Sequence, residues 1–164
     1  TLVMGKCDSE PPVFVNTVKV QSAKDMYDAV IERADSMDII VKAAAVADYR
    51  PKNVSSEKVK KQDGNMSIEL ERTDDILKTL GERKNGQFIC GFSMETENML
   101  ENSRKKLEKK NCDMIVANNL KQDGAGFGGN TNIVTIITKD DEVQLEKMTK
   151  DEVAEKIFDF ILSR

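Results

Sequence analysis

The stretches DIIVKAAA (residues 38–45), QFICGFSM (residues 87–94) and CDMIVA (residues 112–117) are nearly continuous in apolar residues. They are too short for helices of normal length. Runs of this kind are typical of strands that are covered on both faces, as in a parallel sheet. The three stretches therefore predict the buried strands of a parallel β-sheet.

Helical patterns alternate with these strands along the chain. Ser22 can cap a helix whose apolar residues, spaced at i, i+1, i+4, i+5 and i+8 from Met26, would form one buried stripe. Further helices are predicted from about residue 74 to before Asn85, from residue 97 to residue 110, and from Thr149 to the end. The alternation favours an α/β fold of Rossmann-like type, with three layers and a mainly parallel sheet.

Two other segments are typical of strands that have one exposed face or lie at the edge of a sheet. Apolar and polar residues alternate from Met66 to Arg72. The segment from Asn132 to Thr138 is predicted to pair with the segment from Glu142 to Met148 through a turn at residues 140–141. The second pattern adds a C-terminal β-hairpin to the predicted fold.

The length of 164 residues fits one domain, so residues 1–164 are predicted to form a single nucleotide-binding domain. The opening TLVMG reads like the tail of an apolar strand, and no G-x-G-x-x-G turn follows it. We therefore expect that the first strand and the glycine-rich turn of this domain are missing from the chain.

Composition excludes several classes of protein. Without histidine the chain cannot form a Ser-His-Asp or Cys-His arrangement, and Cys7, Cys90 and Cys112 match neither a metal site nor a disulfide framework. The net charge of -4 gives no global support for nucleic-acid binding. No apolar run approaches the ~20 residues of a membrane helix. We expect a cytoplasmic protein that binds neither nucleic acid nor membrane and has no metal-ligand cluster.

Two basic clusters stand out in this acidic chain. Segment 50–61 contains five bases and one acid, and segment 104–110, RKKLEKK, has the same balance. Because ligands of parallel α/β sheets lie beyond the carboxyl ends of the strands, the first cluster is well placed for a polyanion such as a triphosphate. We expect both clusters to bind one phosphorylated nucleotide. The alternative, a solvated loop and a solvated helix end, stays open at this point.

Small and polar residues follow the predicted strands. Alanines 43–45 would let a planar ligand approach the backbone, and Asp48 supplies an acceptor. The amides of Ala-Asn-Asn (residues 117–119) can read the polar edges of a base or substrate, and GFGGNTN (residues 126–132) can turn tightly around Phe127. The amides and glycines are also ordinary turn residues, which leaves that alternative open.

Five motifs in this order, AAAVADYRP, KVKK, GFSMET, ANN and GFGGNTN, closely resemble the phosphopantothenate-cysteine ligase family of coenzyme A biosynthesis. The resemblance spans essentially the whole chain. Its most specific part is AAVADYRP followed by Lys58, ten residues after Asp48, in a Lys-x-Lys-Lys element that is similar to the bacterial, CTP-dependent form.

The resemblance implies a two-step synthesis of an amide. The carboxylate of 4'-phosphopantothenate attacks the α-phosphorus of CTP, giving an acyl-cytidylate and pyrophosphate, and the amine of L-cysteine then displaces CMP. Fixed lysines and Mg²⁺ stabilise the departing pyrophosphate, which requires no histidine. A homodimer is also implied, and we expect the strand from Met66 to Arg72 to form its contact.

The resemblance also implies roles for individual residues. Lys58 and Asn118 are the predicted catalytic residues: Lys58 holds the triphosphate and is essential for acyl-cytidylate formation, while Asn118, with Asn130, serves the substrate side. The residues expected to bind the nucleotide are Ala44, Asp48, Lys58, Lys61, Asp74, Asp75, Ile76, Leu77, Phe92, Lys106 and Lys110.

The chain departs from the family pattern in two places. Family members have a glycine-rich first turn and then an Asn in a Ser-Ser-Gly context, and this chain has neither. We expect the chain to be inactive by itself unless another segment supplies those groups. Asn130 also stands where an Asp is common, which weakens any role for it in binding metal.

Two rival functions stay open on the sequence alone. One is an NAD(P)-dependent dehydrogenase-like module, because Tyr49 precedes Lys52, although the spacing is Tyr-x-x-Lys instead of Tyr-x-x-x-Lys. The other is a nucleotide-binding module without enzymatic activity.

Overall fold

The computed structural model describes residues 1–7, 10–61, 64–95, 97–119 and 129–164. The chain divides into two compact units: unit 1 contains residues 1–30 and 45–76, and unit 2 contains residues 31–44 and 77–164. The elements in chain order are β1 (Leu2–Met4), β2 (Thr17–Lys19), α1 (Ala23–Ala34), β3 (Ile39–Lys42), β4 (Tyr49–Pro51), β5 (Leu70–Arg72), α2 (Ile76–Arg83), β6 (Phe88–Glu95), α3 (Met99–Lys109), β7 (Met114–Asn119), β8 (Thr131–Asn132), β9 (Val134–Thr138), β10 (Glu142–Gln144), β11 (Met148–Thr149) and α4 (Lys150–Leu162).

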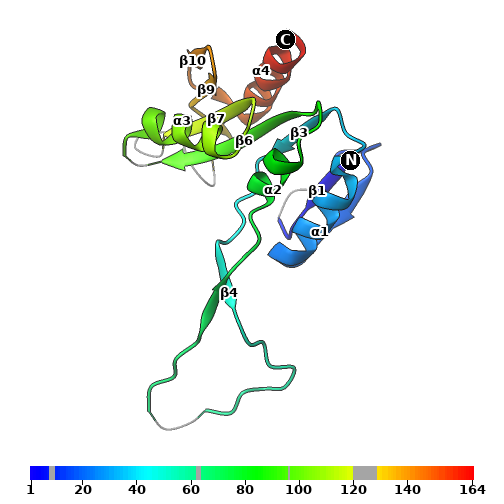
Figure 1. Ribbon diagram of the computed structural model, residues 1–164, viewed down its shortest axis with the longest axis vertical. Helices are drawn as coiled ribbons and strands as arrows, with labels where there is room; N and C mark the ends of the chain where they lie inside the picture. The colour runs from blue at the N-terminus through cyan, green and yellow to red at the C-terminus, as the bar shows by residue number, and fades with distance from the viewer. Residues whose placement is uncertain (8–9, 62–63, 96, 120–128) are drawn as a thin grey trace. The chain divides into compact units, whose positions relative to one another are not determined.

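Unit 2 is built on a five-stranded sheet with the strand order β10-β9-β7-β6-β3 (Figure 1). Strands β3, β6 and β7 are parallel, whereas β9 is antiparallel to both β7 and β10. This arrangement confirms the predicted α/β fold with parallel strands, of which β6 and β7 are largely buried, whereas β3, at the edge of the sheet, is only half-buried and its Val41 is exposed. It also confirms the C-terminal hairpin. The short β8–β11 pair lies at the end of this hairpin that is away from its turn.

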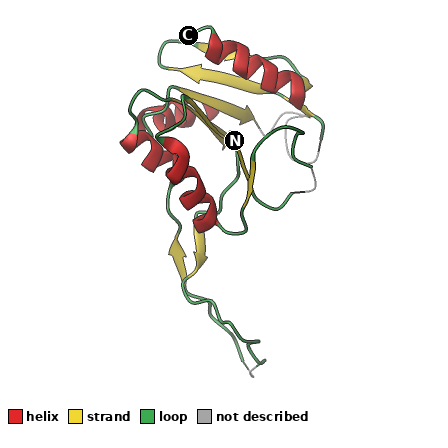
Figure 2. Ribbon diagram, turned by 90° about the vertical axis from the view of Figure 1, so that its right-hand side faces the viewer, coloured by secondary structure: helices red, strands yellow, loops and turns green. Residues whose placement is uncertain are grey.

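Helices cover both faces of this sheet (Figure 2). On one face, Cys90, Met114 and Val116 form a cluster with Val153 and Ile157 of α4. Side chains on the other face have the opposite parity along the strands, and α3 packs there against β6, β7 and β9. Because both faces of β6 and β7 are covered, these two strands need apolar residues at nearly every position, which explains their continuous runs in the sequence.

The helix ends follow local hydrogen bonding. The Ser22 hydroxyl accepts the Asp25 N–H at 3.1 Å before α1, and Thr149 forms a capping box with Glu152 at the start of α4. The expected start of the third helix at residue 97 is two residues too early. Asn98 has a left-handed backbone conformation (φ 48°), which is incompatible with the interior of a helix, and α3 begins at Met99.

Unit 1 contains a parallel pair, β1 with β2, and an antiparallel pair, β4 with β5. We call residues 49–72 the arm; they comprise β4, β5 and the loop between them (Figure 1). The strand expected from Met66 is shorter than predicted, since β5 begins at Leu70. Its partner β4 ends at Pro51, and one further bond, from the Lys52 N–H to the Glu69 carbonyl (3.0 Å), continues the pairing beyond it.

Strand β3 is also shorter than the predicted segment 38–45, and it ends at Lys42. Alanines 43–45, which have a low propensity for strands and little side chain to bury, follow it as exposed coil.

Candidate functional site

The predicted nucleotide-binding and catalytic residues are distributed over both units. Unit 1 contains Asp48, Lys58, Lys61, Asp74, Asp75 and Ile76, and unit 2 contains Ala44, Leu77, Phe92, Lys106, Lys110 and Asn118.

In unit 2, Phe92 and Lys106 lie in direct contact. The Lys106 ammonium donates to the Phe92 carbonyl at 2.9 Å, which joins α3 to the carboxyl half of β6. Both side chains are half-buried. The structure thus brings together two residues that the sequence places 14 positions apart.

Asn118 lies near the carboxyl end of β7, paired in register with Met94 of β6. Its side chain is only 7% exposed, and its Oδ1 atom has no hydrogen-bond partner among the residues that the structure describes. Two residues before it, Val116 is paired with Phe92, so Asn118 and Phe92 project from the same face of the sheet. A buried acceptor without a partner is energetically costly, and such atoms are commonly satisfied by a bound ligand or water.

Lys42 is a basic residue that the sequence reasoning missed. It is the last residue of β3, and its ammonium donates to the carbonyl of Ala44 at 2.8 Å. The signal was visible as a single lysine in the apolar run DIIVKAAA. Ala44 itself is exposed.

The bases of the second cluster, residues 104–110, differ in their hydrogen-bond partners. Arg104 forms an ion pair with Glu142 of β10 at 2.6 Å, and Lys105 forms one with Glu101 at 2.6 Å on the same helix. Lys106, by contrast, bonds to a backbone carbonyl, and no carboxylate pairs with it in the described part of the chain.

In unit 1, Thr73 connects the segment after β3 to the start of α2. Its hydroxyl donates to the Ala47 carbonyl at 2.6 Å, and its N–H donates to the Asp48 carbonyl at 3.0 Å. The exposed residues Asp48 and Asp74 therefore lie near each other at the base of the arm. Ile76 begins α2 with a side chain that is 3% exposed, so a ligand would reach its backbone and not its side chain.

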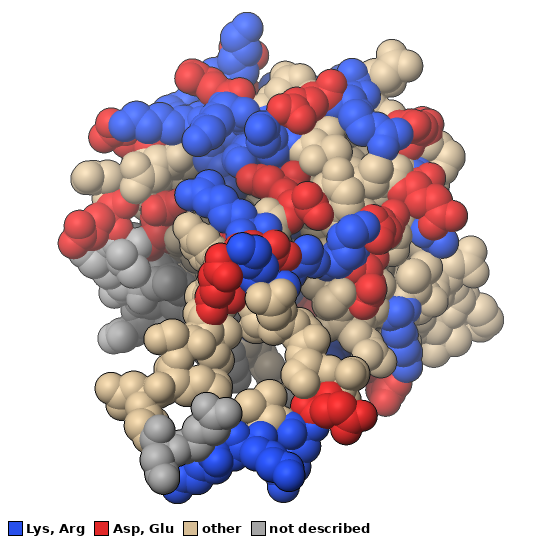
Figure 3. Space-filling model, turned by 60° about the horizontal axis from the view of Figure 1, so that its bottom comes forward, with Lys and Arg blue, Asp and Glu red and all other residues tan. Residues whose placement is uncertain are grey.

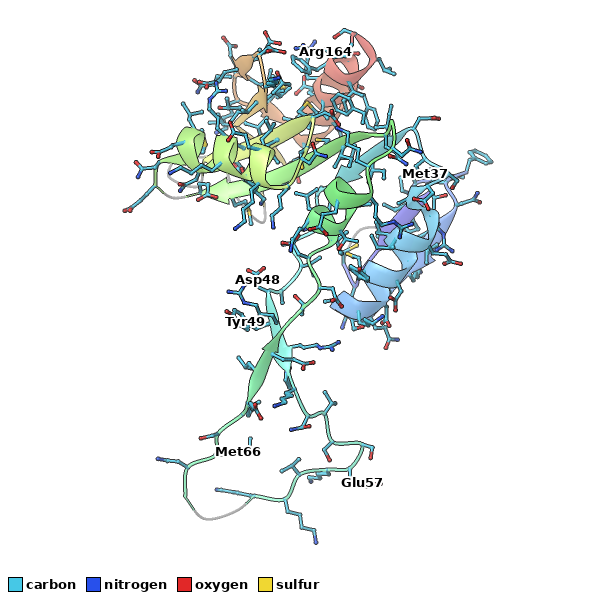
Figure 4. The ribbon with its side chains drawn as sticks, in the orientation of Figure 1. Met37, Asp48, Tyr49, Glu57, Met66 and Arg164 are labelled. Carbon is cyan, nitrogen blue, oxygen red and sulfur yellow. The ribbon has the colours of Figure 1, made fainter. Side chains whose placement is uncertain are left out.

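Cross-strand ion pairs use two of the five bases of the first cluster. Arg50 binds Glu71 and Lys52 binds Glu69, each at 2.7 Å. The remaining bases lie on the loop of the arm, are exposed, and have no carboxylate partner among the residues that the structure describes; they are Lys58, Lys60 and Lys61 (Figure 3). Figure 4 labels Asp48 and Tyr49 at the base of the arm, and Glu57 and Met66 on its loop.

The dehydrogenase alternative finds no support in these contacts. Lys52 is engaged by Glu69, and the guanidinium of Arg72 lies over the ring of Tyr49, 5.7 Å from its centroid. A tyrosine and a lysine that both serve the pairing of β4 with β5 are not arranged for hydride chemistry.

Thr96, the last residue of the GFSMET motif, and residues 120–128, which include Phe127 of the GFGGNTN motif, lie outside the described residues. Asn130 is exposed, and its carbonyl accepts the N–H of Lys150 at the start of α4 at 2.9 Å. Within the described ranges, no three acidic or cysteine side chains gather as a metal site, and no helix is long and apolar enough to cross a membrane.

Comparison with known proteins identifies the family. The family model for the DNA/pantothenate metabolism flavoprotein C-terminal domain matches residues 1–164. The chain belongs to this family. A relative from Bacillus subtilis (strain 168), the coenzyme A biosynthesis bifunctional protein CoaBC, is 53% identical over 131 residues, which are 80% of this chain and 32% of the relative. The chain thus spans about a third of the length of that relative.

Solved structures agree with this placement. The crystal structure of the C-terminal domain of a CoaBC protein is 47% identical, with a TM-score of 0.81 over 99% of this chain and 74% of that chain. A more distant neighbour is a Cab2 mutant in complex with phosphopantothenate-cysteine, at 19% identity and a TM-score of 0.63 over 79% of this chain and 46% of that chain. At this low identity, the second likeness establishes a shared fold alone.

Proposed function

We propose that this chain is the part of a CTP-dependent ligase that joins 4'-phosphopantothenate to L-cysteine in coenzyme A biosynthesis. Membership of the pantothenate-metabolism family supports the proposal, as do relatives named for coenzyme A biosynthesis. The complex of the Cab2 neighbour with phosphopantothenate-cysteine fits the same substrate class.

The proposed reaction has two steps. The carboxylate of phosphopantothenate attacks the α-phosphorus of CTP and expels pyrophosphate, which leaves an acyl-cytidylate. The amine of cysteine then attacks the acyl carbon, forms the amide and expels CMP. In the first step, negative charge grows on the departing pyrophosphate, so cationic side chains held nearby lower the barrier.

The distribution of ion pairs is the observation that carries this proposal. In both basic clusters, carboxylates engage bases to which the family resemblance gives no role, as with Arg50 and Arg104. Lys58, Lys61 and Lys106, to which the resemblance gives a role, have no carboxylate partner in the described ranges. An unpaired ammonium is available to bind phosphate oxygens, whereas a paired one would first have to release its partner.

Mg²⁺ is proposed to arrive with the triphosphate. This ion usually keeps several waters and is bound through one or two carboxylates together with substrate phosphates. The described residues, which lack a dedicated cluster of three acidic side chains, fit such a mode. We assign no protein ligand to the ion.

The test measures CTP-dependent release of pyrophosphate with phosphopantothenate as the acceptor. Because the chain spans only part of its relatives, the assay uses both the chain itself and a fusion that places the preceding residues of the Bacillus subtilis relative before Thr1. Lys58→Gln should abolish pyrophosphate release in whichever form is active. The matched control is Lys60→Gln, an exposed lysine on the same loop without an assigned role, which should retain most activity.

Both lysine changes should leave the free energy of unfolding within about ±0.5 kcal/mol, because surface substitutions rarely do more. Full release of pyrophosphate by the Lys58→Gln variant would refute its role. Inactivity of both forms with CTP, or activity with NADH and not CTP, would refute the ligase itself.

We further propose that the protein is a homodimer that uses the arm. Its two faces differ: the cross-strand pairs Arg50–Glu71 and Lys52–Glu69 cover one face. The other carries Tyr49 and Leu70, which are 51% and 56% exposed, and the segment that leads into β5 adds the exposed side chains of Ile68 (59%) and Met66 (72%). An uncovered apolar strand face of this kind favours contact with a second copy.

Light scattering tests the dimer. Ile68→Asp should reduce the measured mass to that of one 18.4 kDa chain, because it places a charge in the apolar contact. Glu69→Gln, the neighbouring residue on the ionic face, is the matched control and should not change the mass. A wild-type protein with the mass of one chain would contradict the dimer.

A further inference from the structure

Two serine hydroxyls are buried together inside unit 2. Ser93 of β6 is 2% exposed and Ser103 of α3 is 0% exposed, and their Oγ atoms lie 2.7 Å apart. Burying a hydroxyl is unfavourable unless it is hydrogen-bonded, whereas a pair of small apolar side chains could fill the same space at little cost. The pair therefore does more to define how α3 lies on β6 than to stabilise the core.

This hydroxyl pair stands beside the contact between Lys106 and Phe92. Phe92 directly precedes Ser93 on β6, and Lys106 follows Ser103 by three residues, which is about one turn of the helix. The Lys106 ammonium donates to the Phe92 carbonyl at 2.9 Å. Two hydrogen bonds thus join one turn of α3 to two consecutive residues of β6.

We propose that the Ser93–Ser103 hydroxyl pair is a positioning device for Lys106. Lysine has a long and flexible side chain, so the place of its ammonium depends on where the helix holds its Cα atom. The hydroxyl pair fixes the rotation and height of α3 one turn away and keeps that ammonium at the carboxyl half of β6. The consequence for CTP rests on the proposed function, whereas the positioning of Lys106 does not.

The experiment uses Ser93→Ala, Ser103→Ala and the double variant. Each single variant leaves one buried hydroxyl without its partner and should lower the Tm by roughly 2–10 °C, while the double variant should recover most of that loss. If the pair were merely structural, recovered stability would bring recovered function with it. The double variant therefore separates the two roles.

The first readout is the rate at which an amine-specific reagent labels Lys106, measured by peptide mass spectrometry. Lys105 and Lys109 on the same helix are exposed and serve as internal references. The wild-type rate at Lys106 should be slower than at both, because its ammonium is half-buried and hydrogen-bonded. In the double variant it should rise severalfold relative to the references.

The second readout is the kinetics with CTP. The double variant should raise KM for CTP roughly tenfold and change kcat much less, because a displaced charge-assisted contact weakens binding by about that factor. Ser93→Ala is the fallback if the double variant does not fold, since it removes the same contact between the two hydroxyls and should raise the labelling rate at Lys106 in the same direction.

The outcomes distinguish the two proposals. A stable double variant with an unchanged labelling rate at Lys106 would overturn the positioning role, whatever happens to KM. Faster labelling with an unchanged KM would support the positioning role and overturn the nucleotide contact of Lys106. Absence of CTP turnover in the wild type would count against the proposed function alone, and the labelling would still decide the inference.

Discussion

At Gly81, a change to alanine has two opposite effects on stability: helix propensity favours it and tertiary packing opposes it. It lies inside α2, where replacing glycine by alanine normally stabilises a protein by about 1 kcal/mol. A Cβ atom at this position, however, would lie 1.8 Å from the Lys110 carbonyl oxygen and 2.8 Å from its carbon. An ordinary carbon–oxygen contact is about 3.3 Å, so one backbone must move by roughly 1.5 Å.

That movement would have two costs. Overpacking a well-packed interior costs about 1–3 kcal/mol, and the upper end applies because the clashing atoms are backbone and cannot rotate away. Asn111 also donates from Nδ2 to the Gly81 carbonyl at 2.9 Å, and losing this bond costs about 1 kcal/mol. After subtracting the gain in helix propensity, Gly81→Ala should destabilise the protein by about 2–3 kcal/mol.

Thermal unfolding measures the effect directly. For a chain of this length, the Tm should fall by about 4–12 °C. The matched control is Glu82→Ala, an exposed position next along the same helix, which should change stability by less than about 0.5 kcal/mol. A Gly81→Ala variant at least as stable as the wild type would refute the close approach of α2 to residue 110.

Three further predictions concern other parts of the fold. Asp113→Ala removes the acceptor of the Ile89 N–H (2.7 Å) and should lower the free energy of unfolding in urea by about 2 kcal/mol; a change below 0.5 kcal/mol on that scale would contradict it. Thr149→Ala removes the cap of α4 and should cost about 1 kcal/mol, whereas Thr149→Ser should be nearly neutral. Burial raises the pKa of the Cys112 thiol to about 11, so at pH 8 iodoacetamide should modify the exposed Cys7 and spare Cys112, as peptide mapping would detect. Because an unfolded thiol titrates near ~8.5, the stability linked to the neutral Cys112 is fully present below that pH and is lost as pH rises through about 11.

The sequence predicted those elements whose burial is uniform along their length. QFICGFSM became β6 because both faces of that strand are covered, and a continuous apolar run of this length is typical of such a strand. Ser22 and Thr149 were readable as helix starts because capping depends on residues within one turn. These features are local, or they follow from a pattern that burial imposes on neighbouring residues.

Features that depend on distant partners or on single backbone angles were not predictable in this way. Strand β5 begins at Leu70 and not at Met66 because its pairing with the chain beyond β4 ends after the bond from Lys52 to Glu69, and the alternation of residues 66–72 does not show where a partner strand ends. Helix α3 begins after Asn98 because of that residue's own left-handed conformation. The bond from Lys106 to the Phe92 carbonyl follows from how α3 packs on β6, which the spacing of the two residues does not reveal.

The two basic clusters show how far the number of basic residues in a segment predicts a phosphate-binding site. A count of bases along the chain treats the five in segment 50–61 as equivalent. Two of them, however, form ion pairs with Glu69 and Glu71, which lie 17 and 21 residues away in the sequence. Those two bases sit where β4 pairs with β5, so their charge stabilises the arm and is not available to a ligand. The lysines beyond the paired strands keep their charge exposed. A count of basic residues therefore overestimates the capacity of such a loop for phosphate, and the bases that pair across a ladder should be removed from the count before a triphosphate is assigned to the rest.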